Sequence, residues 1–180
     1  MGRIKVLIQP LGDVSEEAVL KLTEMLNVKL DLFEAYMSNR RLPLSEKAYN
    51  PLRRQYHSPH ILKILCRVSE NLDFDRILGV AEADLYVRGL NFIFGEAQLG
   101  GRCAIISLCR LKPEFYGERS DKKLFYLRML KEAVHELGHT LGLNHCRNMK
   151  CVMYFSNSIW DTDMKDYRFC SQCREKIILN

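Results

Sequence analysis

The feature that most constrains this chain is a set of three histidines within eleven residues, His135, His139 and His145. His135 and His139 stand four residues apart, so on a helix both imidazoles leave the same face and can bind one metal ion. Gly142 follows His139 by three residues, where a helix that stops and turns needs a residue free to take positive φ. The turn would then bring back His145 as a third ligand. Three imidazoles and a water are typical of catalytic zinc, because a structural site closes the fourth position with protein.

Glu136 directly follows the first of these histidines. In that position its carboxylate can reach the water and act as a general base without becoming a ligand. The pentapeptide alone has an alternative interpretation, since two histidines and a glutamate can also form a solvated or internally paired helix face. The longer spacing, with glycine at the bend and Met153 eight residues after His145, favours the metal site.

The chain has seven cysteines, and four of them have the spacing of metal ligands. One pair is separated by four residues and the other by two, with 18 residues between the pairs. These four are Cys146, Cys151, Cys170 and Cys173. Because a cytosolic compartment keeps thiols reduced, the pattern predicts a closed structural zinc site with four thiolate ligands; unrelated core thiols are the alternative. The other three, Cys66, Cys103 and Cys109, are predicted to be single small residues of the core.

Length and composition predict one domain with its own core, since the chain has 180 residues and 47% hydrophobic content. The N-terminal apolar run is too short for a signal peptide, and no segment approaches the roughly 18 apolar residues of a membrane span. We therefore expect a cytoplasmic protein with no membrane partner. The formal net charge of +5 would suit a nucleic-acid-binding module built on the cysteines. Because the Lys and Arg residues are dispersed and no aromatic stripe accompanies them, no nucleic acid partner is expected.

Hydrophobic periodicity predicts a mixed α/β (α+β) fold. Five strands are expected, over residues 3–9, 28–36, 77–85, 91–98 and 102–111. Helices are expected from a cap at Asp13 or Ser15, over 58–70, from Asp121 to about Gly142, and over 171–179. A Gly-Gly turn makes the last two strands antiparallel, whereas helical crossovers make the others parallel. The segment 91–98 is therefore the single antiparallel strand and is expected at the sheet edge, over the cleft.

Residues 38–60 are polar, contain several prolines and arginines, and show no sustained period. They are predicted to be a long loop, and loops of this length are often functional. Four of them are candidates for lining a substrate path, Tyr49, Gln55, Tyr56 and His57. A solvated connector is an equal alternative.

The chain resembles the archaemetzincins, a family of the metzincin clan of zinc peptidases. The resemblance rests on the histidine and cysteine spacings given above, on Met153, and on the order of strands and helices upstream. It implies a metzincin-like mixed five-stranded sheet with one antiparallel edge strand, a long active-site helix, and a small irregular C-terminal subdomain held by a structural zinc. One metallopeptidase domain, 1–180, would then comprise an N-terminal subdomain, 1–142, and a C-terminal subdomain, 143–180.

The resemblance also implies a role for Met153, which would form the tight Met-turn beneath the metal's histidines and contribute no ligand. Some metzincins have a tyrosine two residues after this methionine as an extra metal ligand. Phe155 occupies that position here, and Tyr154 comes one residue early. Tyr154 is therefore not expected to bind the metal.

Together, the residues and the resemblance predict a zinc-dependent metallopeptidase that hydrolyses peptide bonds through zinc-bound water, with Glu136 as general base. Two zinc ions are expected per chain, one catalytic and one structural, with a peptide or protein substrate and a monomeric state. An extended substrate could pair with the edge strand 91–98 by β-augmentation. Two alternatives stay open: a zinc-binding protein of the same fold with weak or no peptidase activity, and a basic zinc-ribbon-like nucleic-acid-binding module.

Overall fold

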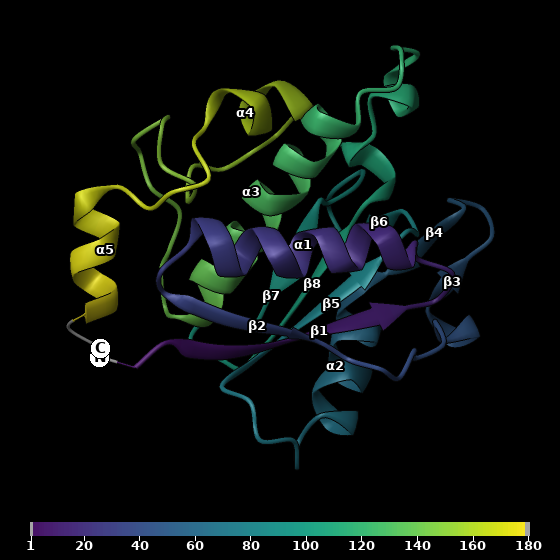
Figure 1. The fold of residues 1–180 in the computed structure, drawn as a ribbon. Helices are drawn as coiled ribbons and strands as arrows, with labels where there is room; N and C mark the ends of the chain where they lie inside the picture. The colour runs from purple at the N-terminus through teal and green to yellow at the C-terminus, as the bar shows by residue number, and fades with distance from the viewer. Residues whose placement is uncertain (1, 179–180) are drawn as a thin grey trace.

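A five-stranded mixed sheet forms the centre of the protein in the computed structural model, which describes residues 2–178 (Figure 1). The strand order is β2-β1-β5-β8-β7. Its members are β1 (Ile4–Leu11), β2 (Phe33–Met37), β5 (Arg76–Ala81), β7 (Gly95–Ala97) and β8 (Cys103–Ser107). Neighbouring strands are parallel except β7 and β8, which are antiparallel. The predicted mixed sheet with one antiparallel edge strand is confirmed.

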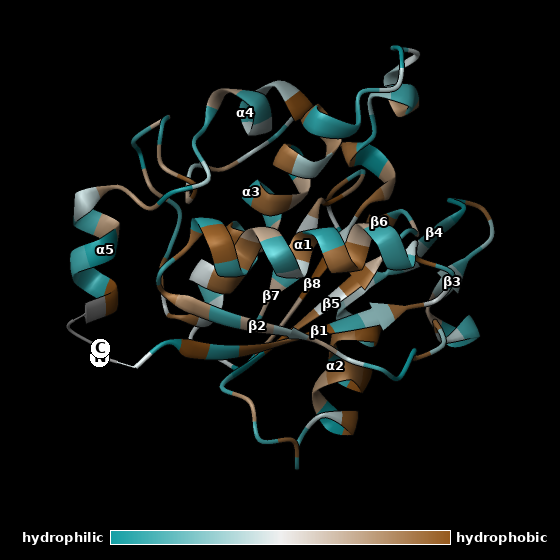
Figure 2. Cartoon of the chain, in the orientation of Figure 1, coloured by the Kyte–Doolittle hydropathy of each residue, from teal (hydrophilic) through white to brown (hydrophobic). Residues whose placement is uncertain are grey.

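Helices cover both faces of this sheet (Figure 1). One face carries α1 (Glu16–Lys29) and α3 (Lys122–Thr140), and the other carries α2 (Ser58–Val68). The larger hydrophobic core lies between the sheet, α1 and α3 and continues into the chain that follows α3. A smaller core lies beneath α2. Figure 2 shows the hydrophobic residues along β1, β5 and β8, as expected for strands covered on both sides.

Helices α1 and α3 begin at predicted capping residues, whereas α2 begins at Ser58 itself, with His57 before it and no side-chain cap. Ser15 accepts a hydrogen bond from the amide of Ala18, and Asp121 accepts one from the amide of Leu124. Beyond α3 the described chain forms two short helices, α4 (Ile159–Met164) and α5 (Ser171–Ile178). The sequence predicts α5, whose last expected residue, 179, lies outside the described residues, but it does not predict α4, which is too short to show a period. Within residues 2–178, no helix is long and apolar enough to cross a membrane.

Several strands are shorter than predicted. The predicted strand 28–36 begins only at Phe33, because α1 continues through Lys29 and Val28 is an exposed helical residue. The strands expected over 77–85, 91–98 and 102–111 shorten to β5, β7 and β8. Beyond β8 the chain turns into short 3-10 helices, η2 (Cys109–Leu111) and η3 (Pro113–Tyr116). Leu108 and Leu111 are nevertheless fully buried. The apolar pattern therefore continues beyond the end of the strand, and a strand length predicted from that pattern is too long.

The segment 38–60 contains structure that the sequence does not predict. A 3-10 turn, η1 (Glu46–Ala48), leads into β3 (Tyr49–Asn50), which pairs antiparallel with β4 (Gln55–His57). β4 then pairs in parallel with β6 (Leu85–Tyr86), giving a small second sheet of order β3-β4-β6. The prediction of a long loop was therefore wrong, because strands of two or three residues are too short to show an alternating pattern.

Cys66 and Cys103 are not separate core residues as predicted. The structure joins them as a disulfide between α2 and β8, with their Cα atoms 5.7 Å apart and a sequence separation of 37. The pairing arises because α2 packs against β8, a contact that cysteine spacing cannot reveal. Cys109 is a single free thiol, as predicted, but it is only half-buried and belongs to neither hydrophobic core, so its prediction as a core residue was wrong.

Candidate active site

The three predicted histidines lie together at the C-terminal end of α3. His135 and His139 are one turn apart on the helix, and His145 returns to them from the following loop. Their ring centroids are 4.7 to 5.4 Å apart, and each ring offers a nitrogen within 4.8 Å of the other two. The Nε2 atoms of His135 and His139 are 3.1 Å apart. Gly142, at the bend, has φ of 86°, so the predicted positive φ is confirmed.

Backbone carbonyls orient two of the imidazoles. Nδ1 of His135 donates to the carbonyl of Val152 and Nδ1 of His139 to that of Leu143, both at 2.7 Å. These bonds leave the Nε2 lone pairs directed at a common point, the usual arrangement around a metal-binding histidine. Burial lowers the pKa of His135, as does the nearby Lys165 ammonium, so the ring is held neutral. Three neutral nitrogen donors with an exposed His145 fit an open zinc site.

Glu136 lies beside this group and is almost completely buried. Burial raises its pKa well above the usual value, and the neighbouring carboxylate of Glu132 raises it further. β7 passes close over the side chain at Gly95, where a Cβ would lie 2.6 Å from both Cγ and Oε1 of Glu136. Glycine is therefore required at position 95 for the edge strand and the carboxylate to share this space.

A cleft of about 540 Å³ opens above these residues. Its floor contains the histidines and Glu136, and one side is formed by β7 and the chain before it. Apolar side chains make up much of the wall: Val87, Leu90, Phe92, Ile93, Phe94, Leu99 and Phe155. The four candidates from segment 38–60, Tyr49, Gln55, Tyr56 and His57, do not line the cleft. The hypothesis that they form a substrate path was therefore wrong.

Met153 lies directly beneath the histidine-bearing helix. Its side chain is fully buried, and Sδ packs so closely against Gly138 that a Cβ there would overlap it. Met153 itself lies in a tight turn over residues 151–154, in which the amide of Tyr154 donates to the carbonyl of Cys151 at 2.9 Å. Phe155 then packs against His145, with ring centroids 4.8 Å apart.

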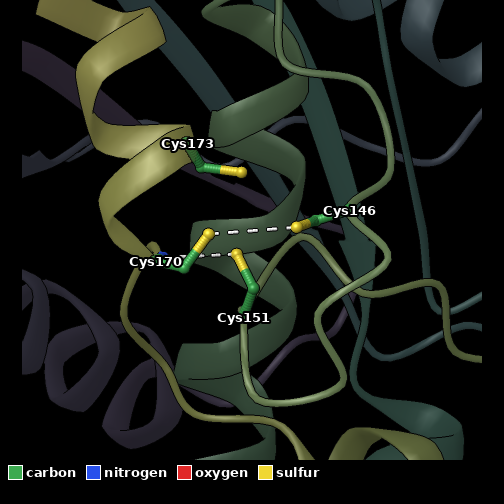
Figure 3. A group of neighbouring side chains, drawn as sticks. All are labelled: Cys146, Cys151, Cys170 and Cys173. Carbon is green, nitrogen blue, oxygen red and sulfur yellow. Dashed lines mark hydrogen bonds between the residues drawn. The ribbon is translucent and has the colours of Figure 1, made fainter.

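The four predicted cysteine ligands also converge. Cys146 and Cys151 come from the turn after α3, and Cys170 and Cys173 from the start of α5, with sulfur atoms within 4.8 Å of one another (Figure 3). The amides of Asn148 and Cys170 donate to the sulfurs of Cys146 and Cys151 at 3.4 and 3.3 Å. Burial raises the pKa of the Cys151 thiol, whereas hydrogen bonds from neighbouring groups lower the pKa of Cys170. Four sulfur donors with amide hydrogen bonds fit a closed zinc site.

Sequence reasoning missed a buried ion pair behind His135. Lys165 is fully buried, and its Nζ lies 3.0 Å from Oε1 of Glu132 and 3.5 Å from Nδ1 of His135. The hydroxyl of Thr162 donates to the same Glu132 oxygen at 2.9 Å. The only sequence signal was a run of charged residues on a helix that is otherwise apolar around most of its surface. Glu132 itself also lines the cleft.

Removing one member of this pair should destabilise the protein strongly. In Lys165→Met, the Glu132 carboxylate would stay buried without its cation, and we expect the free energy of unfolding to fall by about 3–5 kcal/mol. The double change Lys165→Met with Glu132→Leu removes both charges and should recover most of that loss. Urea denaturation measures all three proteins, with the exposed Lys63→Met as control, expected to change by less than about 0.5 kcal/mol. A Lys165→Met protein as stable as the control would show that Lys165 and Glu132 do not form a buried ion pair that the fold needs.

Gly95→Ala should displace Glu136. The new Cβ would overlap the carboxylate, so we expect peptide hydrolysis to fall by about 10- to 100-fold while the histidines still bind metal. Gly2→Ala is the control, because Gly2 has no positive φ, a Cβ there would meet no atom within 4 Å, and the residue does not line the cleft. Initial rates and zinc content per chain would be measured together. Equal rates in the Gly95→Ala variant and the parent would show that the close approach has no catalytic consequence.

Comparisons with known proteins identify a family of peptidases. The model of the family described as Peptidase family M54 matches residues 3–178. An archaemetzincin of Methanocaldococcus jannaschii is 45% identical over 174 residues, which cover 97% of this chain and 93% of that protein.

Solved structures give the same result. The crystal structure of archaemetzincin from Archaeoglobus fulgidus, complexed with malonate, has a TM-score of 0.83 and 42% identity, covering 96% of this chain and 99% of the other. A zinc-dependent peptidase from Methanocorpusculum labreanum has a TM-score of 0.77 and 27% identity, with the same coverage. Since the family model and its relatives cover almost all of the chain, the protein belongs to peptidase family M54, the archaemetzincins, and is a zinc metallopeptidase.

Proposed function

We propose that His135, His139 and His145 hold the catalytic zinc and that Glu136 is the general base. The protein would hydrolyse extended peptides bound in the cleft. The observation that carries this proposal is the convergence of three imidazole nitrogens beside a buried carboxylate, on the floor of a cleft bordered by an edge strand. A structural metal site would have no use for the adjacent Glu136 or for the open side at His145.

The side chains divide the chemistry between them. A zinc ion at the histidines would supply a Lewis acid that activates water and polarises the peptide carbonyl. Glu136, whose pKa burial raises, is suited to take a proton from the attacking water and to deliver it to the leaving amine. Val152 and Leu143 keep two imidazoles in the tautomer that leaves Nε2 free. Gly95 leaves room for Glu136 to act directly under the substrate backbone.

The substrate is proposed to lie along β7. This strand is at the edge of the sheet, so an extended peptide can add to it as a further antiparallel or parallel partner. The cleft wall is largely apolar, and the charged side chains among its described lining residues are the carboxylates of Glu96, Glu132 and Glu136. Peptides with apolar side chains beside the cleaved bond should therefore be preferred over acidic ones.

A second zinc is proposed at Cys146, Cys151, Cys170 and Cys173. Support comes from the crowding of four sulfur atoms within 4.8 Å of one another, two of them on the buried residues Cys151 and Cys173. The ion would hold α5 to the turn after α3. The monomeric state, the cytoplasmic location and the lack of a nucleic acid partner stay predictions from the sequence.

Glu136→Gln tests the catalytic assignment. Glutamine keeps the volume but removes the basic carboxylate, so zinc content should be unchanged while peptide hydrolysis falls by about 10²-fold or more. The measurement is cleavage of a peptide library with metal analysis of the same samples. If the variant cleaves as fast as the parent, Glu136 is not the base. If the parent cleaves no peptide in the library, the alternative of a weak or inactive protein of this fold is favoured.

Metal removal should occur in two stages. The histidine site is open, since His145 is exposed, whereas Cys151 and Cys173 are buried, so a mild chelator should remove one of two zinc ions first with little loss of helix. Zinc quantification and circular dichroism along a chelator titration check this. A single zinc in freshly purified, reduced protein would exclude the second site.

A further inference from the structure

One wall of the cleft is held in place by a part of the chain that does not line it. Leu90, Asn91 and Phe92 line the cleft, and Leu90 and Asn91 are exposed. These three residues, called the cleft lip below, lie between β6 and β7 and belong to neither strand. Their position therefore depends on contacts from outside the main sheet.

Arg53, in the turn between β3 and β4, and Gln55, the first residue of β4, supply those contacts. Arg53 donates through Nη2 to the carbonyls of Leu90 and Asn91, at 3.0 and 2.8 Å. Gln55, almost completely buried, donates through Nε2 to the same Asn91 carbonyl at 2.9 Å. Three hydrogen bonds thus converge on two consecutive carbonyls of the lip.

The two donors are themselves fixed. Arg53 Nε donates to Oε1 of Gln55 at 2.8 Å, and the guanidinium lies over the ring of Tyr86, 4.4 Å from its centroid. Nε2 of Gln55 also donates to Oδ2 of Asp84 at 2.9 Å. Asp84 in turn binds Arg110 through two hydrogen bonds of 2.8 Å. Such a connected network orients each donor before any substrate arrives.

Arg110, which binds Asp84, also contacts the cleft lip. Its guanidinium lies 4.2 Å from the ring centroid of Phe92, which faces the cleft. The lip is thus held at both ends, through its carbonyls by Arg53 and Gln55 and through an aromatic ring by Arg110.

We propose that Arg53 and Gln55 are positioning residues for substrate binding: they hold the cleft lip where it contacts a peptide extended along β7. This rests on the proposed function of the cleft. It also assigns a role to the segment 38–60, whose residues act behind the cleft wall. An unsupported lip would have to be ordered by each substrate, which lowers affinity without altering the metal site.

The test compares two ligands that share a zinc-binding group. Acetohydroxamate can occupy the metal alone, whereas a tripeptide hydroxamate with leucine side chains also extends along the cleft. Arg53→Met removes the donors but keeps an apolar chain over Tyr86. Arg54→Met is the matched control, because Arg54 is the exposed neighbour, carries the same charge and makes no hydrogen bond through its side chain within residues 2–178.

In zinc-loaded protein, Arg53→Met should weaken the tripeptide hydroxamate by about tenfold, the factor expected for one or two hydrogen bonds, and change acetohydroxamate by less than about twofold. Zinc content and Tm should match the parent, and Arg54→Met should change neither affinity. Hydrogen exchange in a peptide spanning 87–94 should be faster in Arg53→Met, while exchange in α3 stays the same. Gln55→Glu, which replaces the donor by a second carboxylate beside Asp84, should weaken the tripeptide hydroxamate as well.

Three outcomes would overturn the proposal. If the Arg53→Met protein keeps the parent's affinity for the tripeptide hydroxamate, the hydrogen bonds from Arg53 to the cleft lip are not needed for binding. Equal weakening of both ligands shows a general structural defect. If the parent itself binds the tripeptide hydroxamate no better than acetohydroxamate, the cleft does not hold extended peptides, and the proposed function fails together with this inference.

Discussion

The structure depends on satisfying the polar side chains that α3 buries. An unpaired charge or hydrogen-bonding group inside a protein costs several kcal/mol, on the order of the whole stability of a domain. Arg128 therefore binds Asp163, Lys131 donates to the carbonyls of Thr162 and Asp163, and Glu132 pairs with Lys165. His135 and His139 use the carbonyls of Val152 and Leu143. All of these partners belong to residues 143–165, so this stretch is fixed by polar complementarity to one helix although little of it is regular.

The same arrangement couples the two candidate metal sites. Cys146 follows His145 directly, and its amide donates to the carbonyl of Met153 at 2.9 Å. The neighbouring carbonyl, that of Val152, accepts the hydrogen bond from His135. A metal bound by the cysteines would therefore also fix the third histidine and the carbonyl that orients the first. Because metal chemistry is sensitive to displacements of less than 1 Å, such a metal would contribute to the geometry of the histidine site from a distance.

Much of the site could be predicted from the sequence because its residues are close in the chain. The spacing of the histidines, the bend at Gly142 and the two cysteine pairs are local patterns. The main strands of the fold could also be predicted, because they are continuous apolar segments. The Lys165 and Glu132 pair could not be predicted, since 32 residues lie between its members and neither has a distinctive neighbour. The contact of Gly95 with Glu136 and the disulfide between Cys66 and Cys103 likewise depend on how distant elements pack. The polarity of Gln55 suggests contact with a ligand, but its side chain donates to the backbone of the cleft wall at Asn91, and a sequence cannot distinguish these two roles.

The edge strand β7 has a further consequence. An unpaired strand edge invites pairing with the same edge in another copy, and long exposed edges lead to aggregation. β7 is only three residues long, and all three line the cleft rather than a flat face of the molecule. A single unfolded chain is narrow enough to reach such a recessed edge, whereas the border of a folded sheet, with its neighbouring strands and covering helices, is not. We expect this recess both to keep the protein from assembling through its own sheet and to spare folded proteins from cleavage.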